Sequence, residues 1–380
     1  MNRIYLDYAA TTPVDERVVK VMASCLNDIF GNPSSLHYYG QSSRKVIEDA
    51  RRVIAEALNA EIDEIFFTSG GTESNNLAVI GAARANRNKG NHLITTTIEH
   101  HSVLHAFHKL GKEGFIVTYL PVDSSGILDP NELISAITQD TILVSVMHAN
   151  NEIGTIQPIN EIYKILQGRS ILFHVDGVQY FPHYRVNVKW IGADLYSISS
   201  HKMYGPKGIG ALYIRNGVAL EPLFAGGGQE KGVRPGTENV SAIAGFGESV
   251  IILEKEKGIE TKRLKKLRDL FISSILSSVD GSCLNGDPVS RLPNNASISF
   301  ARLDGELLVI SLDLEGVACS TGSACASRGT ALSHVLKAIG LSNEGVRSTL
   351  RFTLGRSTDL QEIERTVKIV SQVANKMRSL

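Results

Sequence analysis

The stretch Tyr196-Ser197-Ile198-Ser199-Ser200-His201-Lys202-Met203-Tyr204-Gly205-Pro206-Lys207-Gly208 places a polar turn between two strand-like runs. The first run, Ala193 to Ile198, alternates apolar and polar residues, and the second covers Gly208 to Ile214. Lys202 would then lie just beyond the carboxyl end of a strand, where open α/β sheets bind ligands. A lysine amine there can form a Schiff base with a carbonyl cofactor if its surroundings suppress its charge. A surface lysine in a hairpin turn is the alternative, and this stretch alone leaves both open.

The composition is that of an ordinary globular protein without a charge bias. The chain has 380 residues, 43% of them hydrophobic and 21% charged, and 39 basic residues balance 39 acidic ones. This length allows two sub-domains, and the zero net charge predicts no nucleic-acid or membrane partner. No apolar run approaches the roughly 20 residues of a membrane span, and the first residues have no signal-peptide core. The cysteines lack zinc-ligand spacing, which predicts a reduced cytoplasmic set: Cys25, Cys283, Cys319 and Cys325.

Strand-like and helical runs alternate through the first two thirds of the chain. Amphipathic helical patterns fall, for example, at 43–58, 104–110, 130–137 and 159–167. The strand-like runs are 64–68, 92–97, 115–120, 141–147, 171–175, 193–198 and 209–214. This alternation predicts an α/β fold with a mostly parallel seven-stranded sheet covered by helices.

A second, smaller unit follows. A helix-rich stretch at 242–278 has a charged middle at 254–268, which we expect to bridge two domains. Beyond it, strands at 296–300 and 349–354 and helices at 305–313, 332–339 and 360–377 predict an α+β unit. Small and polar residues before Pro13 predict an extended arm at the start of the chain. We therefore expect a large domain at 15–255 and a small domain made of 1–14 and 256–380.

The segment Ser69-Gly70-Gly71-Thr72-Glu73-Ser74 connects a predicted strand to a helix expected at 75–85. Glycines before a helix start would present free backbone N–H groups and the positive end of the helix dipole to an anion. The segment is neither a Walker loop nor a dinucleotide-binding fingerprint, which weakens a nucleotide interpretation. A capped turn without a ligand is the alternative.

Polar residues at the ends of several predicted strands would share one cleft with Lys202. Asp176 could keep a pyridine nitrogen protonated, which makes a pyridoxal ring an electron sink, although an aspartate there could also cap a helix. His100 could stack on such a ring and move protons, or it could be an ordinary hydrogen-bonded histidine. Ser199, His201 and the Gly70-Gly71-Thr72 turn could hold one phosphate. Together these residues favour a phosphorylated aldehyde cofactor.

Motifs along the whole chain resemble those of cysteine desulfurases of the NifS/IscS type. The resemblance implies a class V aminotransferase with the fold type I architecture of pyridoxal 5'-phosphate enzymes, working as a homodimer. The matching stretches are Leu6 to Thr12, Phe30 to Ser35, Thr68 to Asn75, His148 to Gly154, His174 to Gln179, Ser197 to Gly208, Gly226 to Glu230 and Arg234 to Asn239.

The resemblance also assigns roles to individual residues. Lys202 would bind the cofactor through a Schiff base, and Asp176 would pair with its pyridine nitrogen. Gln179 would reach the ring hydroxyl, and His100 would stack on the ring and carry protons. Arg351, whose planar fork suits a carboxylate, would bind the substrate's α-carboxylate. The remaining assignments are Gly71, Thr72, Ser199 and His201 on the phosphate, Thr237 reaching the cofactor from the other subunit, and Asn150 beside the cofactor and the substrate carboxylate.

Cys325 decides the expected reaction. It lies in a small, polar, glycine-containing segment, Ser320 to Gly329, where a thiolate would be available to attack. By resemblance it would take sulfur from L-cysteine as a persulfide and leave L-alanine. The long loop from about Ser323 to Ser333 would then let Cys325 pass sulfur to an acceptor protein, in iron–sulfur cluster assembly or tRNA thiolation.

Several points stay open at this stage. A selenocysteine lyase or an aminotransferase of the same fold, or a non-enzymatic scaffold, would keep part of the pattern. We expect Cys25 and Cys283 to be buried and inert, and Cys319 to be a strand-end residue, with a resolving thiol as the alternative. Ser200 stands where many relatives of this type have glycine, and the chain does not identify its sulfur acceptor.

Overall fold

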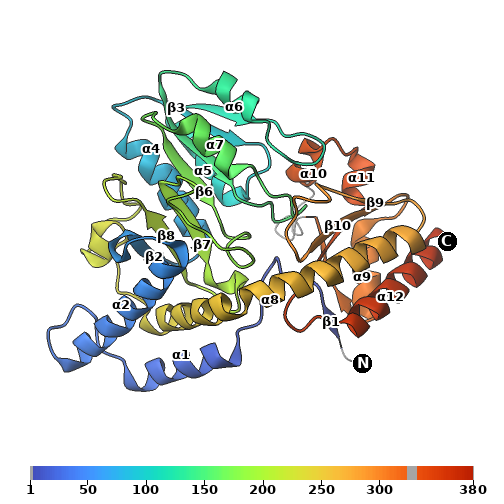
Figure 1. Cartoon of the computed structure of the whole chain (residues 1–380), viewed down its shortest axis with the longest axis horizontal. Coiled ribbons are helices and arrows are strands. Elements are labelled where there is room, and N and C mark those ends of the chain that lie inside the picture. The colour runs from blue at the N-terminus through green and yellow to red at the C-terminus, as the bar shows by residue number, and fades with distance from the viewer. Residues whose placement is uncertain (1–2, 323–331, 380) are drawn as a thin grey trace.

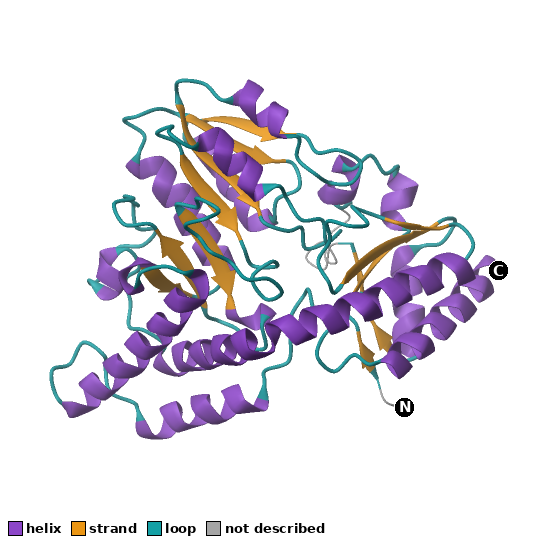
Figure 2. Cartoon of the chain, in the orientation of Figure 1, coloured by secondary structure: helices purple, strands orange, loops and turns teal. Residues whose placement is uncertain are grey.

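The computed structural model describes residues 3–322 and 332–379. A seven-stranded sheet forms the centre of the larger part, in the order β2-β8-β7-β6-β5-β3-β4 (Figures 1 and 2). β8 is antiparallel to both its neighbours and the other pairings are parallel, which confirms the predicted mostly parallel α/β fold. The strands are β2 Ile65–Thr68, β3 His92–Thr96, β4 Ile116–Leu120, β5 Thr141–Met147, β6 Leu172–Asp176, β7 Leu195–Ser199 and β8 Gly210–Ile214.

Buried residues show that the large sheet is covered on both faces. β5 and β7 are buried along their whole lengths, as strands covered by helices on both faces must be. The helices of this part are α1 Glu16–Asp28, α2 Tyr38–Leu58, α3 Gly71–Asn76, α4 Ala82–Ala85, α5 His101–Lys112, α6 Pro130–Ala136 and α7 Ile159–Leu166.

The helix expected at 75–85 begins four residues earlier than predicted. α3 continues through a π-helical turn, η2 Leu77–Gly81, into α4. Gly70 precedes it with φ 150°, a backbone conformation that favours glycine, and Glu73 Oε2 accepts the N–H of Ser69 at 2.8 Å. These two features allow the helix to start directly after the glycine turn.

The smaller part has a four-stranded antiparallel sheet in the order β12-β13-β10-β9. The N-terminal strand β1 Ile4–Tyr5 also belongs to the smaller part, where it forms a separate two-stranded parallel sheet with β11 Val317–Ala318. Its other strands are β9 Ser282–Leu284, β10 Asn295–Phe300, β12 Ser320–Thr321 and β13 Thr349–Thr353, and its helices are α9 Gly305–Leu314, α10 His334–Ala338, α11 Asn343–Arg347 and α12 Leu360–Arg378.

The helix α8, Val240–Ser278, runs beneath both parts (Figure 1). It packs on α1 and α2 near its start and on α12 and β9 near its end. Leu253 is the last α8 residue in the core around the large sheet, and Leu264 is the first in the core around the small sheet. We propose that the division into 15–255 and 1–14 with 256–380 follows these two cores.

A buried ion pair anchors the segment before α8. Arg51 on α2 donates from both terminal nitrogens to Glu230, at 2.7 and 2.8 Å, and Glu230 also accepts the N–H of Phe67 at 2.9 Å. Glu230 lies in the short helix η4, Gln229–Gly232, and both charged side chains are buried. Buried charges of this kind depend on each other, because either one alone would lack compensation.

We expect Glu230→Gln to lower the free energy of unfolding by about 3 kcal/mol, because it leaves the buried Arg51 guanidinium with only the more exposed Glu48 as a counter-charge. Urea unfolding at a fixed protein concentration measures this. The control is Asp49→Asn, which breaks exposed pairs with Lys45 and Arg52 and should cost less than about 1 kcal/mol. Equal losses in the two variants would contradict the role given to the buried pair.

Candidate active site

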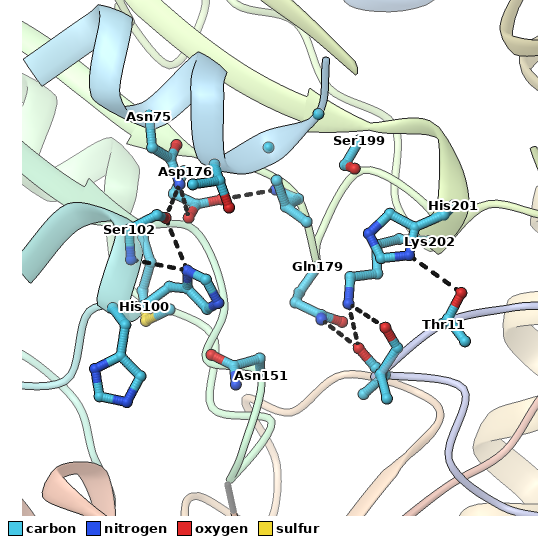
Figure 3. A pocket seen from close by; sticks show the side chains of 18 of the residues that line it. Thr11, Asn75, His100, Ser102, Asn151, Asp176, Gln179, Ser199, His201 and Lys202 are labelled. Carbon is cyan, nitrogen blue, oxygen red and sulfur yellow. Dashed lines mark hydrogen bonds between the residues drawn. The ribbon is translucent and has the colours of Figure 1, made fainter. Parts of the chain in front are cut away.

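A cavity of about 560 Å³ lies between the carboxyl ends of the large sheet's strands and the small part. The N-terminal arm supplies Ala9, Ala10 and Thr11, and the small part supplies His334 and Arg351. The segments that follow β2, β6 and β7 supply most of the remaining wall, as expected for ligand sites in open α/β sheets. Nine of the twelve residues predicted for the site therefore line one cavity, several of which Figure 3 labels.

Lys202 follows β7 in the short helix η3, Ser200–Lys202, and lines the cavity. Its Nζ donates to the carbonyl oxygens of Ala9 and Ala10, at 2.6 and 2.8 Å. Gln179 Nε2 donates to the same Ala9 oxygen at 3.1 Å, so the arm aligns both side chains (Figure 3). Lys202 does lie in the connection between the antiparallel strands β7 and β8, but it is directed into a cavity, so the surface-lysine alternative is wrong.

Asp176 ends β6 and is buried. Its Oδ1 accepts the N–H of Val178 at 3.0 Å, and its Oδ2 accepts Asn75 Nδ2 at 2.7 Å. Burial raises the pKa of the Asp176 carboxyl, while these hydrogen bonds and the charge of Lys202 act in the opposite direction. An acidic group therefore lies in the same cavity as a lysine amine.

One end of the cavity, which we call the anion end, carries donors suited to an anion. Gly71 and Thr72 begin α3, and Ser199 and His201 line the same region. Within the described part of the chain, the buried Ser199 hydroxyl has no hydrogen-bond partner. Gly71 must stay small here, because a Cβ on it would lie 2.9 Å from Val178 Cγ2. Free donors and a close backbone approach are what a phosphate group needs.

His201 lines the anion end of the cavity, whereas its neighbour Ser200 does not. His201 Nδ1 lies 3.2 Å from Thr11 Oγ1, and burial together with Lys202 and Lys207 lowers its pKa to about 4. Ser200 is fully buried and does not line the cavity. The hydroxymethyl group that replaces the usual glycine is therefore placed outside the anion end.

His100 is the N-cap residue of α5 and lines the cavity. Its Nδ1 accepts the N–H of Ser102 at 3.1 Å and lies 2.7 Å from Ser102 Oγ. Burial, followed by the charge of Lys202, lowers the pKa of His100 to about 4. His100 is therefore neutral at physiological pH.

Arg351 in β13 is buried and reaches the cavity from the small part. Its Nη2 donates to Asp7 Oδ1 at 2.8 Å and its Nη1 to the carbonyl oxygen of Asn151 at 3.0 Å. Within the described residues its Nε has no hydrogen-bond partner. The guanidinium is thus fixed in direction and keeps a donor for an incoming group.

Two predicted residues do not line the cavity. Asn150 is fully buried; its Nδ2 donates to the carbonyl oxygen of Ile98, and its Oδ1 accepts the N–H groups of Glu152 and Ile153. Asn150 therefore shapes the turn after β5, and its neighbour Asn151 takes the place in the cavity wall.

Thr237 lies in a neighbouring hollow of about 150 Å³, beside Ser69, Gly208 and Arg234. Its predicted contact with a cofactor bound in another subunit stays a prediction.

The four cysteines differ in their surroundings. Cys325 lies outside the described residues. Cys25 is buried as predicted, but Cys283 is exposed, because it belongs to the short strand β9 at the edge of its sheet. Burial raises the pKa of the Cys319 thiol far above its ordinary value, which disfavours the thiolate that a resolving cysteine needs.

Asn75 and Ser102 line the cavity but were missed in the sequence. Asn75 donates both to Asp176 and to Ser102 Oγ, at 2.7 and 2.9 Å. The available signal was weak: both are short polar residues beside a predicted helix start, where a cap is the ordinary explanation.

The described helices include none long and apolar enough to cross a membrane. Within the same described residues, no three His, Cys, Asp or Glu side chains are placed to hold a metal ion together.

Known proteins are similar to this chain over nearly its whole length. A model of the aminotransferase class-V family matches residues 4–366. Cysteine desulfurase IscS of Dictyoglomus turgidum is 51% identical over 381 residues, covering 100% of this chain and 96% of that protein. Cysteine desulfurase IscS 1 of Archaeoglobus fulgidus is 50% identical, covering 99% of this chain and 98% of that protein.

Solved structures agree with this comparison. A NifS-like protein superposes with a TM-score of 0.93 at 36% identity, covering 98% of this chain and 100% of the other. A structure described as SspA in complex with cysteine superposes with a TM-score of 0.83 at 36% identity, covering 92% and 98%.

We expect His100 to titrate at about pH 4 in the ligand-free protein, because burial and the Lys202 charge both oppose its protonation. Lys202→Met should raise this midpoint, since it removes the positive charge and leaves the burial. Histidine ring signals followed by NMR across pH, with His100→Gln for assignment, measure both values. A midpoint near the ordinary 6.5 in the unmodified protein would contradict the burial argument.

Proposed function

Because this chain belongs to the aminotransferase class-V family, we propose that it is a pyridoxal-phosphate-dependent cysteine desulfurase of the IscS type, which converts L-cysteine to L-alanine and passes the sulfur on. Its full-length relatives named cysteine desulfurase IscS support this activity. The observation that carries the proposal is one cavity with Lys202, the buried Asp176 and an anion end built from Gly71, Thr72 and Ser199.

These residues fit pyridoxal 5'-phosphate. The unpartnered Ser199 hydroxyl, as judged within the described residues, and the backbone at Gly71 suit its phosphate. Asp176 suits its pyridine nitrogen, and Gln179 its ring hydroxyl. Lys202 can give up its hydrogen bonds to the carbonyl oxygens of Ala9 and Ala10 and form a covalent bond with the cofactor's aldehyde carbon. When bound through this lysine, the cofactor supplies an electron sink for charge that develops next to the amino acid's α-carbon.

The chain's own residues bind and orient the substrate. Arg351 would hold the α-carboxylate of L-cysteine through a charge-assisted hydrogen bond, with Asp7 and the carbonyl of Asn151 fixing its direction. Neutral His100 would stack on the cofactor ring and present a ring nitrogen for proton movement. We give Asn151, rather than Asn150, the predicted place beside cofactor and substrate, because Asn151 lines the cavity.

The sulfur step needs a nucleophile, which we assign to Cys325. Its thiolate attacks the sulfur of L-cysteine; an S–S bond forms and the carbon–sulfur bond breaks. The electron pair of the broken bond remains with the β-carbon, which takes up a proton and becomes the methyl group of L-alanine. The sulfur is oxidised from thiol to persulfide while the carbon is reduced, so no further oxidant is required.

We further propose that the protein works as a homodimer in the cytoplasm and that Thr237 of each subunit completes the cofactor site of the other. The persulfide would be delivered to an acceptor protein, either an iron–sulfur scaffold or a tRNA-thiolation enzyme.

We expect the purified protein to be yellow from lysine-bound cofactor, and Lys202→Ala to lose that absorption band because the bond to the protein is gone. Absorption spectra after incubation with pyridoxal 5'-phosphate and dialysis measure this. Lys207→Ala is a matched control, since Lys207 also lines the cavity and should leave the band in place. A band that survives in Lys202→Ala would overturn the cofactor assignment.

We expect Cys325→Ser to form L-alanine at least 100-fold more slowly from L-cysteine, because a serine hydroxyl is a far weaker nucleophile than a thiolate. Its yellow band should remain. Alanine release and protein-bound persulfide are measured, with Cys283→Ser as the control, since Cys283 is an exposed cysteine outside the cavity. Undiminished alanine release would reject Cys325.

The same assay separates the alternatives. A selenocysteine lyase would release alanine from selenocysteine and not from L-cysteine, and an aminotransferase would make alanine only with a keto acid present.

A further inference from the structure

A chain of hydrogen bonds connects Asp176 to His100 along one wall of the cavity (Figure 3). Asn75 Nδ2 donates to Asp176 Oδ2 at 2.7 Å and to Ser102 Oγ at 2.9 Å. Ser102 Oγ lies 2.7 Å from His100 Nδ1, and the Ser102 N–H donates to the same nitrogen at 3.1 Å. Asn75, Ser102 and Asp176 are all buried, so bulk water has little access to these bonds.

The donors in this chain leave a single arrangement of protons. The Asn75 amide must turn its N–H groups to Asp176 Oδ2, because its oxygen would repel a carboxylate oxygen. The second N–H of the amide then donates to Ser102 Oγ, so the serine hydroxyl is left to donate its own proton to His100 Nδ1. With two donors directed at Nδ1, the proton of the neutral imidazole must be on Nε2.

We propose that Ser102 and Asn75 are positioning residues that hold His100 in the neutral, Nε2-protonated form and orient its ring from the carboxylate of Asp176. The proposal rests on the function given above, in which His100 faces the cofactor ring and Asp176 receives its pyridine nitrogen. One network would thereby set the group on the face of the cofactor ring and the group at its nitrogen.

The network has a direct chemical consequence for His100. Protonation would place an N–H at Nδ1, facing the Ser102 N–H, and would cost the bond from the serine hydroxyl. A hydrogen bond to the neutral form disfavours the charged form, so the network opposes protonation. Figure 3 shows the other ring nitrogen of His100 turned away from Ser102. His100 thus keeps its one exchangeable proton on that nitrogen.

The other titratable groups near His100 either oppose its protonation or do little to favour it. Lys202 and three histidines oppose its protonation by their charge, whereas the Asp176 carboxylate reaches it only through Asn75 and Ser102. Glu99, its chain neighbour, accepts from Thr96 and from the N–H of Met147 through Oε1, and burial raises its pKa to about 8, which disfavours a negative charge next to His100. The three histidines are His101, His105 and His334.

The test compares two buried serine–histidine pairs in the full-length protein. Ser102→Ala removes the hydroxyl next to His100. The control Ser145→Ala removes the hydroxyl that lies 2.8 Å from His174 Nδ1, a buried pair that does not line the cavity. A merely structural role would give similar losses of stability in the two variants and would leave the ionisation of His100 unchanged in both.

We expect Ser102→Ala to increase the share of the Nδ1-protonated tautomer, although the backbone N–H of residue 102 still favours the Nε2-protonated form. The titration midpoint of His100 should rise by about half to one pH unit, a three- to tenfold change in its protonation constant. Ring-nitrogen NMR shifts of labelled histidine, assigned with His100→Gln, report both. Ser102→Thr, which keeps the hydroxyl, should restore the original values, and Ser145→Ala should leave them unchanged. No shift in Ser102→Ala, or an equal shift in Ser102→Thr, would overturn the proposal.

A double variant tests Asn75. If Asn75 acts through Ser102, Asn75→Ala should shift His100 in the original chain and add nothing in Ser102→Ala. Additive shifts would remove Asn75 from the proposal. The acid limb of kcat/KM for alanine formation should move with the NMR midpoint. If the unmodified protein forms no alanine from cysteine, the proposed function fails, and the tautomer measurement still decides the role of Ser102.

Discussion

The N-terminal arm joins the two halves of the site, and the rest of its geometry depends on it. The backbone carbonyls of Ala9 and Ala10 hold the amine of Lys202, which belongs to the large sheet. Two residues earlier, Asp7 binds Arg351 through Oδ1 and Ser320 through Oδ2, both in the small sheet. A lysine and an arginine from separate cores are therefore positioned against each other by one short extended segment.

Different parts of the site would bind the cofactor's phosphate and set the charge around its ring. The groups that we assign to the phosphate lie at or just after the carboxyl ends of β2 and β7. The groups that set charge, Asp176 and His100, are linked to each other through buried side chains. Burial acts oppositely on the two: it raises the pKa of the Asp176 carboxyl and lowers that of the His100 imidazole. Burial therefore opposes the charged form of both groups.

Much of this was accessible from the sequence, and the exceptions have physical reasons. β5 was predicted with its observed bounds because 141–147 is a continuous buried run. The helix at 75–85 was placed too late, since its start depends on Gly70 with φ 150° and on the Glu73 side chain, which local periodicity does not reveal. Asn150 and Asn151 are identical neighbours, and only the tight turn that binds Asn150 decides which one faces the cavity.

The long helix α8 has a consequence for how the molecule unfolds. At a rise of about 1.5 Å per residue, its 39 residues extend over about 58 Å, and its two ends belong to different hydrophobic cores. Unfolding of either core would remove the packing that stabilises that end of the helix. The helix would then be less stable as a whole and would pack less firmly against the other core. The two cores are therefore coupled mechanically through one backbone, so that the chain should lose its structure as a single cooperative unit despite having two sheets.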